Sequence, residues 1–90
     1  MQTAANSSIV QSIVINKNIM NKTQATEWVR ANYELRKFDD TNGTYRFEQY
    51  GSKFLKKLGF NRYFTRRLEN GVDLVFAVMD PSASDYTLPG

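Results

Sequence analysis

The side chains of this sequence that could do chemistry are basic, and they are concentrated in one segment. Between Arg46 and Arg67 the chain holds seven arginine and lysine residues and a single acidic one, Glu48, which gives this segment a net charge of +6. The whole chain carries only +3. Basic groups that neutralise the phosphates of a nucleic acid release condensed counterions, which favours binding. The segment therefore predicts contact with nucleic acid; the alternatives are an ordinary solvated surface or a surface for an acidic protein partner.

We expect the contact residues on a helix at about 46–58 and on the strand that follows it. Lysines on the helix face opposite its apolar stripe would lie beside the arginines of the strand, and a tyrosine between those arginines could stack on a nucleotide. The candidate nucleic acid-binding residues are Lys53, Lys56, Lys57, Arg62, Tyr63, Arg66 and Arg67.

Other kinds of chemistry have little support in the composition. The chain contains no cysteine and no histidine, which removes thiolate nucleophiles, disulfides and the usual zinc and copper ligands. The only adjacent acidic pair, Asp39 and Asp40, lies in a predicted turn, where ending a helix and forming the turn explain it. The glycines match neither a phosphate-binding loop nor a dinucleotide fingerprint. We therefore expect no enzyme activity, no metal and no cofactor.

The length allows one small domain. Ninety residues suffice for a single core, which we place at residues 9–80, with flexible tails expected at 1–8 and 81–90 because both ends are rich in small, polar and turn-forming residues. The first 16 residues carry no basic side chain, and Gln11 and Ser12 interrupt their apolar positions. No signal peptide or membrane span is predicted, so the expected location is cytoplasmic, without a membrane partner.

The segment Ile9–Ile15 is rich in β-branched residues, which predicts a strand. A short helix capped by Ser8 is the alternative, because the apolar pairs also fall one helical turn apart. As a strand, the segment either pairs within the chain or offers an edge to which a partner strand, or a second copy in a homodimer, could add.

A first helix is predicted from about residue 23 to 38. Asn21 or Thr23 can cap it, and Gln24 stands in the capping-box position relative to Asn21. Its expected apolar face consists of Trp28, Ala31, Leu35 and Phe38, and Ala25 and Val29 widen it.

The second helix, at 46–58, follows from a similar spacing. Apolar side chains recur at intervals of three, four and four, and Gly59 stands where a left-handed cap residue belongs. The recurring residues are Phe47, Tyr50, Phe54 and Leu58, and Gly51 and Leu55 flank their stripe. From the two helices and the last strand we expect these side chains to be largely buried: Trp28, Leu35, Phe38, Phe54, Leu58 and Phe76.

Asn70-Gly71 predicts a β-hairpin. A three-residue loop at 69–71 sets Leu68 opposite Val72, Phe64 opposite Phe76 and Arg67 opposite Asp73. The inner face of the hairpin would then consist of Phe64, Leu68, Val72, Leu74, Phe76 and Val78, interrupted by Arg62 and Arg66. Its outer face would carry Tyr63, Thr65, Arg67 and Asp73.

Together these elements predict an α+β domain in the order β-α-α-β-β, with two helices on a small antiparallel sheet. A winged-helix-like arrangement would place the second helix and the hairpin on DNA or RNA. The order of ribbon-helix-helix dimers is a less favoured alternative, because Ile9–Lys17 offers only Lys17 as a base. The expected function is a small non-catalytic accessory or regulatory domain, as mobile elements often encode, that binds nucleic acid. The alternative is a protein-binding or inhibitor module that uses the basic face or the N-terminal edge strand.

Overall fold

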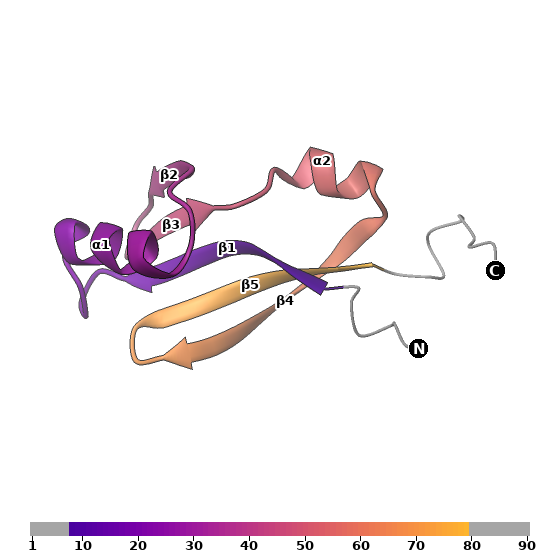
Figure 1. Cartoon of the computed structure of the whole chain (residues 1–90). Helices are drawn as coiled ribbons and strands as arrows, with labels where there is room; N and C mark the ends of the chain where they lie inside the picture. The colour runs from indigo at the N-terminus through magenta and orange to yellow at the C-terminus, as the bar shows by residue number, and fades with distance from the viewer. Residues whose placement is uncertain (1–7, 80–90) are drawn as a thin grey trace.

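The computed structural model describes residues 8–79, so the predicted tails lie outside the described residues except for Ser8, which begins the first strand. Seven elements follow one another in the order β-α-β-β-α-β-β (Figure 1). They are β1 (Ser8–Asn16), α1 (Lys22–Asn32), β2 (Lys37–Asp40), β3 (Thr44–Glu48), α2 (Ser52–Lys57), β4 (Phe60–Glu69) and β5 (Val72–Met79). The α+β class and the single small domain are confirmed, whereas the predicted order β-α-α-β-β is wrong.

All five strands form one antiparallel sheet in the order β2-β3-β1-β5-β4. The N-terminal strand is confirmed, and the helical alternative for this segment is not what forms. Strand β1 is central: Ile13 pairs with Phe47 of β3 on one side and with Leu74 of β5 on the other. Both edges of β1 are paired within the chain from Ser12 to Ile15, whereas Ser8–Val10 pairs with β5 alone. Of the two predicted alternatives, pairing within the chain is what forms, and addition of a partner strand or a second copy stays a prediction.

Helix α1 begins where the capping box predicts. The Asn21 side chain accepts a hydrogen bond from the Gln24 amide at 2.8 Å, and the Gln24 side chain accepts one from the Asn21 amide at 2.9 Å. The helix ends at Asn32, six residues before the predicted end at Phe38. Its buried residues are Ala25 and Val29, the two predicted to widen the apolar face, whereas Leu35 and Phe38 lie beyond the end of the helix.

The early end of α1 follows from what Phe38 gains in a strand. Phe38 lies in β2 opposite Phe47, with the ring centroids 5.1 Å apart, and it stacks on Tyr45 at 5.9 Å. Pairing with β3 provides hydrogen bonds and these aromatic contacts together, which a further helical turn would not provide. Leu35, left in the connection, is 39% exposed, so its predicted burial is wrong.

The predicted helix at 46–58 is mostly wrong. Residues 44–48 form β3, and only the six residues of α2 are helical. Phe47 is 2% exposed between β1 and β2, a position that only a strand reaches. Residue 51 is the N-cap of α2, which shortens the helix to less than half its predicted length. As a result Leu55 is buried, while Phe54 and Leu58, predicted to be buried, are about half exposed.

The hairpin of β4 and β5 turns where Asn70-Gly71 predicts, and Gly71 has a φ of +84°. Phe64 faces Phe76 and Arg67 faces Asp73, as predicted. Beside the turn, however, Glu69 rather than Leu68 faces Val72, because the register shifts by one residue between Arg67 and Glu69. The chain therefore combines a two-residue loop with a bulge at Leu68, instead of a three-residue loop.

The helices cover opposite faces of the sheet. The α1 face carries Ile13, Ile15, Val72 and Leu74, which form the main core with Ala25, Val29 and Phe47. The α2 face carries the alternate side chains of the same strands, among them Ser12, Val75 and Ala77. Leu55 of α2 and Ala77 are fully buried outside the main core cluster. In Figure 1, the two helices lie near opposite ends of the twisted sheet, and β4 passes behind β5 as it approaches α2.

This arrangement decides which predicted core residues are buried. Trp28, Phe38 and Phe76 are half-buried against the main core. Phe64 and Leu68 of β4 are 40% and 49% exposed. Helix α1 does not cover them because it packs near β3, toward the opposite edge of the sheet. The two helices are not consecutive and do not form the helix pair on which a winged-helix-like arrangement depends.

Candidate nucleic-acid interface

The seven candidate residues lie on two consecutive elements. Three lysines are on α2, and the other four residues are on β4, which follows α2 after Leu58 and Gly59. Helix α2 contacts β4, and all seven side chains are exposed. Helix α2 is short because Gly51 begins it and Gly59, with a φ of +98°, follows it. The proximity that the sequence predicts between the lysines and the basic strand is therefore present.

The candidate residues do not share one face of the sheet. Arg62 and Arg66 lie opposite Val78 and Leu74, which places them on the α1 face, as the predicted inner face requires. Tyr63 and Arg67 lie opposite Ala77 and Asp73 on the α2 face. Only Tyr63 and the α2 lysines are therefore on the same side of the sheet near α2.

Two arginines have partners within the chain. Arg67 Nε donates a hydrogen bond to Asp73 Oδ1 at 2.5 Å, so this guanidinium is largely neutralised. The Arg66 guanidinium lies 5.8 Å from the centroid of the Phe64 ring, a cation-π distance. The ion pair reduces what Arg67 can contribute to an external anion, whereas the cation-π contact leaves the charge and the N–H donors of Arg66 in place.

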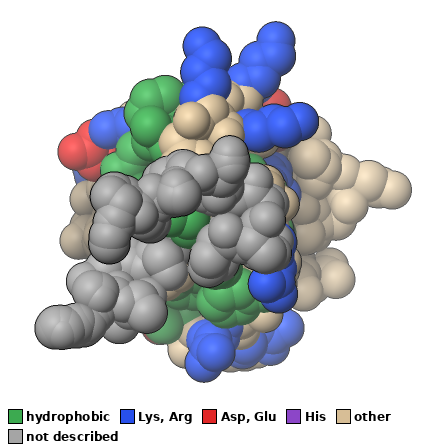
Figure 2. Space-filling view, turned by 90° about the vertical axis from the view of Figure 1, so that its right-hand side faces the viewer, with side chains coloured by type: hydrophobic (Ala, Val, Ile, Leu, Met, Phe, Trp, Pro, Cys, Tyr) green, Lys and Arg blue, Asp and Glu red, His purple; other side chains and the backbone are tan. Residues whose placement is uncertain are grey.

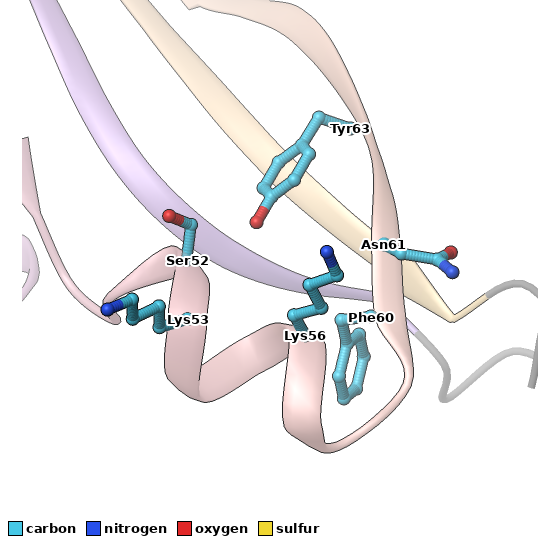
Figure 3. A pocket seen from close by; sticks show the side chains of 6 residues that line it. All are labelled: Ser52, Lys53, Lys56, Phe60, Asn61 and Tyr63. Atoms are coloured by element: carbon cyan, nitrogen blue, oxygen red, sulfur yellow. The ribbon is translucent and has the colours of Figure 1, made fainter.

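A groove of about 460 Å³ lies between α2 and β4. We call it the α2–β4 groove; its lining residues are Ser52, Lys53, Lys56, Phe60, Asn61 and Tyr63 (Figure 3). The Tyr63 hydroxyl points toward α2, and the Lys56 side chain extends from α2 toward Tyr63. Asn61 points away from them on the outer side of β4, and Lys53 extends from the helix in another direction. The groove thus joins three of the candidate residues: Lys53, Lys56 and Tyr63.

A second hollow, of about 320 Å³, lies beside the groove and shares Ser52 and Tyr63 with it. Its other lining residues are Gln11, Arg46, Glu48 and Val75. Tyr63 therefore stands between two open spaces, and its side chain is 42% exposed.

A buried amide network forms the floor of the second hollow. Gln11, which is 2% exposed, donates from Nε2 to Glu48 Oε2 at 3.1 Å and to the Tyr50 carbonyl at 2.8 Å. Its Oε1 accepts hydrogen bonds from Arg46 Nη2 at 3.1 Å and from the Ser12 hydroxyl at 2.5 Å. All these polar groups are satisfied, so the network is structural: it ties the bulge of β1 to β3 and to the chain that leads into α2.

Seven lining residues of the two hollows are not among the candidate residues: Gln11, Arg46, Glu48, Ser52, Phe60, Asn61 and Val75. One signal was visible. Gln11 and Ser12 interrupt an otherwise apolar strand, which is typical of a bulge or a polar contact at that position. No local signal brings residue 11 next to residue 46, because their contact depends on the pairing of β1 with β3.

Basic side chains do not form one continuous patch. In Figure 2, which views the α2 end of the molecule, the visible basic side chains lie in separate groups at its upper, left, right and lower margins. The upper group lies over α2. The interface therefore consists of separate basic positions rather than a uniformly charged plane.

The acidic pair lies in a strand rather than in the predicted turn. Asp39 and Asp40 belong to β2, where Asp39 faces Arg46 across the strands and Asp40 forms an ion pair with Lys17. Within residues 8–79, no three acidic side chains gather closely enough to hold a metal ion. Neither α1 nor α2 is long and apolar enough to cross a membrane.

Comparisons of the chain with protein-family models, with curated proteins and with solved structures give no match.

Proposed function

We propose that this chain is a small non-catalytic domain that binds nucleic acid through the α2–β4 groove and the lysines beside it. One observation carries the proposal: an exposed tyrosine and two lysines, Tyr63, Lys53 and Lys56, line the same groove. Proteins that bind single-stranded nucleic acid without sequence preference combine these two groups: basic side chains contact the phosphates, and an aromatic ring stacks on a base.

The charge of the neighbouring surface supports this proposal. Lys57 lies on the same helix, and no acidic residue lies between Ser52 and Leu68. An approaching phosphate backbone would therefore meet attraction along both elements. Arg62 and Arg66, on the other face of β4, serve as a secondary electrostatic contribution, and Arg67 contributes little because Asp73 already pairs with it.

A salt titration tests the proposal. Binding of a labelled oligonucleotide is measured at several salt concentrations for the wild-type chain and for Lys56→Ala. Losing one phosphate contact should lower the slope of log affinity against log salt by about one. The matched control is Arg30→Ala, which removes the same charge from an exposed position on α1, on the opposite face of the sheet. It should leave the slope unchanged.

Two results would count against the proposal. One is a wild-type chain that binds neither DNA nor RNA at about 50 mM salt, where multiple phosphate contacts are strong. The other is an equal effect of the Lys56 and Arg30 substitutions, which would indicate that only the net charge matters.

A protein partner is the second candidate function, and the position of β4 favours it. Strand β4 is an edge strand of the sheet, and every residue from Asn61 to Glu69 is exposed. An acidic strand from another protein could therefore add to this edge. Arg62 and Arg66 would then face the partner's acidic side chains. In that case Arg66→Glu would abolish partner binding, whereas nucleic acid binding through the groove would persist in weakened form.

A further inference from the structure

We infer that the α2–β4 groove receives one unstacked base of a single-stranded nucleic acid, with the Tyr63 ring as the stacking surface. This inference rests on the proposed function and extends it. The ligand is a single-stranded nucleic acid, and Tyr63 is the residue that discriminates a single strand from a duplex.

The first argument is that the Tyr63 ring is available. The side chain borders the groove on one side and the second hollow on the other. Among the described residues, no aromatic ring stacks on it and no cation lies over it. The neighbouring Phe64 is almost equally exposed, at 40%, but it stacks on Phe76 with the ring centroids 5.0 Å apart and the planes within 10° of parallel. Of these two similarly exposed rings, Tyr63 is the one without an aromatic or cationic partner among the described residues.

The second argument is the chemistry around that ring. Lys56 extends from α2 toward Tyr63, and Ser52 lies on the same wall of the groove as Lys56 (Figure 3). An ammonium group beside an aromatic ring is the arrangement that holds a phosphate while the attached base stacks. The volume of about 460 Å³ lies within the range of small-ligand pockets, about 300–1,000 Å³, and the groove is therefore large enough to receive a base.

The third argument concerns the conformation of the ligand. Bases in a duplex are stacked and paired, so their faces cannot reach a ring that lies in a groove unless a nucleotide is flipped out, which costs a few kcal/mol. A single strand presents its bases without that cost. The lysines attract both forms through their phosphates, but only the single strand gains the contact with Tyr63.

The test compares a 12-residue oligo-dT with a duplex of equal length, each labelled and titrated with the full chain. Tyr63→Ala should weaken oligo-dT binding about five- to 150-fold, the range for loss of one stacked base, and change duplex binding little. Tyr63→Phe keeps the ring and should bind like the wild type. Phe64→Ala is the matched control, with an adjacent position and similar exposure on the other face, and should have a much smaller effect.

A measurement on the unaltered chain keeps the inference testable even if Tyr63→Ala fails to fold. On titration with oligo-dT, the ring protons of Tyr63 should shift upfield in NMR spectra, while those of Phe64 stay in place. Equal losses for oligo-dT and duplex in Tyr63→Ala, a larger loss in Phe64→Ala, or an unshifted Tyr63 ring would each overturn the inference. If one of these results were found while the salt slope still depended on the lysines, the inference about Tyr63 would fail and the proposed function would remain. Absence of binding to both probes would remove the two together.

Discussion

Two glycines with left-handed backbone differ in what surrounds them. Gly71 has a φ of +84°, and a Cβ added there would lie 2.6 Å from Ile19 Cγ2. Gly43 has a φ of +93°, and a Cβ added there would meet nothing within 4 Å. Backbone conformation alone therefore requires glycine at residue 43, whereas residue 71 also requires the absence of a side chain, because the hairpin turn packs against the connection that follows β1.

We expect Gly43→Ala to lower the free energy of unfolding by about 1–2 kcal/mol, the cost of left-handed backbone for an L-residue. Gly71→Ala should add about 1–3 kcal/mol for overpacking against Ile19. Urea unfolding of both variants beside the wild type measures the difference. Equal losses of unfolding free energy in the two variants would show that Ile19 moves aside without cost. In that case, adding Ile19→Ala to Gly71→Ala would restore none of the lost stability.

At the scale of elements, α2 shows how a short helix is held. Six residues are too few for a stable isolated helix, so α2 depends on its contact with the sheet. That contact is made by Leu55, which is fully buried, whereas Phe54 and Leu58 are 52% and 49% exposed. The position of α2 in turn forms one wall of the α2–β4 groove, so the packing of one leucine controls the candidate site.

We expect Leu55→Ala to destabilise the domain by about 2–5 kcal/mol, as for other buried leucines. Phe54→Ala and Leu58→Ala, which remove comparable or larger side chains from the same helix, should each cost only about 1 kcal/mol because about half of that surface is already in water. Urea unfolding measures all three. A loss at Phe54 as large as that at Leu55 would mean that the aromatic contact with Tyr50, at 6.3 Å between ring centroids, contributes more than its exposure indicates.

For the whole molecule, β1 is the strand that joins two smaller parts of the sheet. The β2–β3 pair lies on one side of it and the β4–β5 hairpin on the other, and within residues 8–79 no ladder connects these two parts except through β1. Ile13 and Ile15, both with no exposed surface, also form the centre of the main core. The N-terminal strand is therefore an integral part of the fold rather than an accessory edge.

A chain that begins at Met20 should consequently lose its fold instead of merely losing a dimer. Isolated two-stranded pairs are marginally stable at best in water, so we expect no cooperative unfolding transition in circular dichroism, whereas the full chain should show one. Sedimentation of the two chains at equal concentration is the companion measurement. A folded monomer from the shortened chain, beside a dimeric full chain, would contradict the central role of β1 within one molecule.

Several features of this protein could be predicted from the sequence because neighbouring residues determine them. The capping box of Asn21 and Gln24, the turn at Asn70-Gly71 and the β-branched strand at 9–15 each depend on conformational preferences within a few residues. The predicted register of Phe64 opposite Phe76 is also present, although the bulge at Leu68 sets it and not the predicted three-residue loop. The alternation of a strand puts Arg62 and Tyr63 on different faces. The +6 charge of the segment is a property of composition and needs no structure.

The remaining features were decided by contacts between residues far apart in the chain. The apolar spacing of Phe47, Tyr50, Phe54 and Leu58 fits a helix, but Phe47 forms strand pairs with Ile13 and Phe38, and their burial outweighs the local pattern. The same pairing ends α1 early and leaves only six residues for α2. The α2–β4 groove, with Tyr63 and Lys56 on its walls, exists because α2 packs on the face of the sheet opposite α1. Only the tertiary structure decides on which face of the sheet α2 packs. That face depends on how β1 and β5 are placed in the sheet, and not on the residues of α2 themselves.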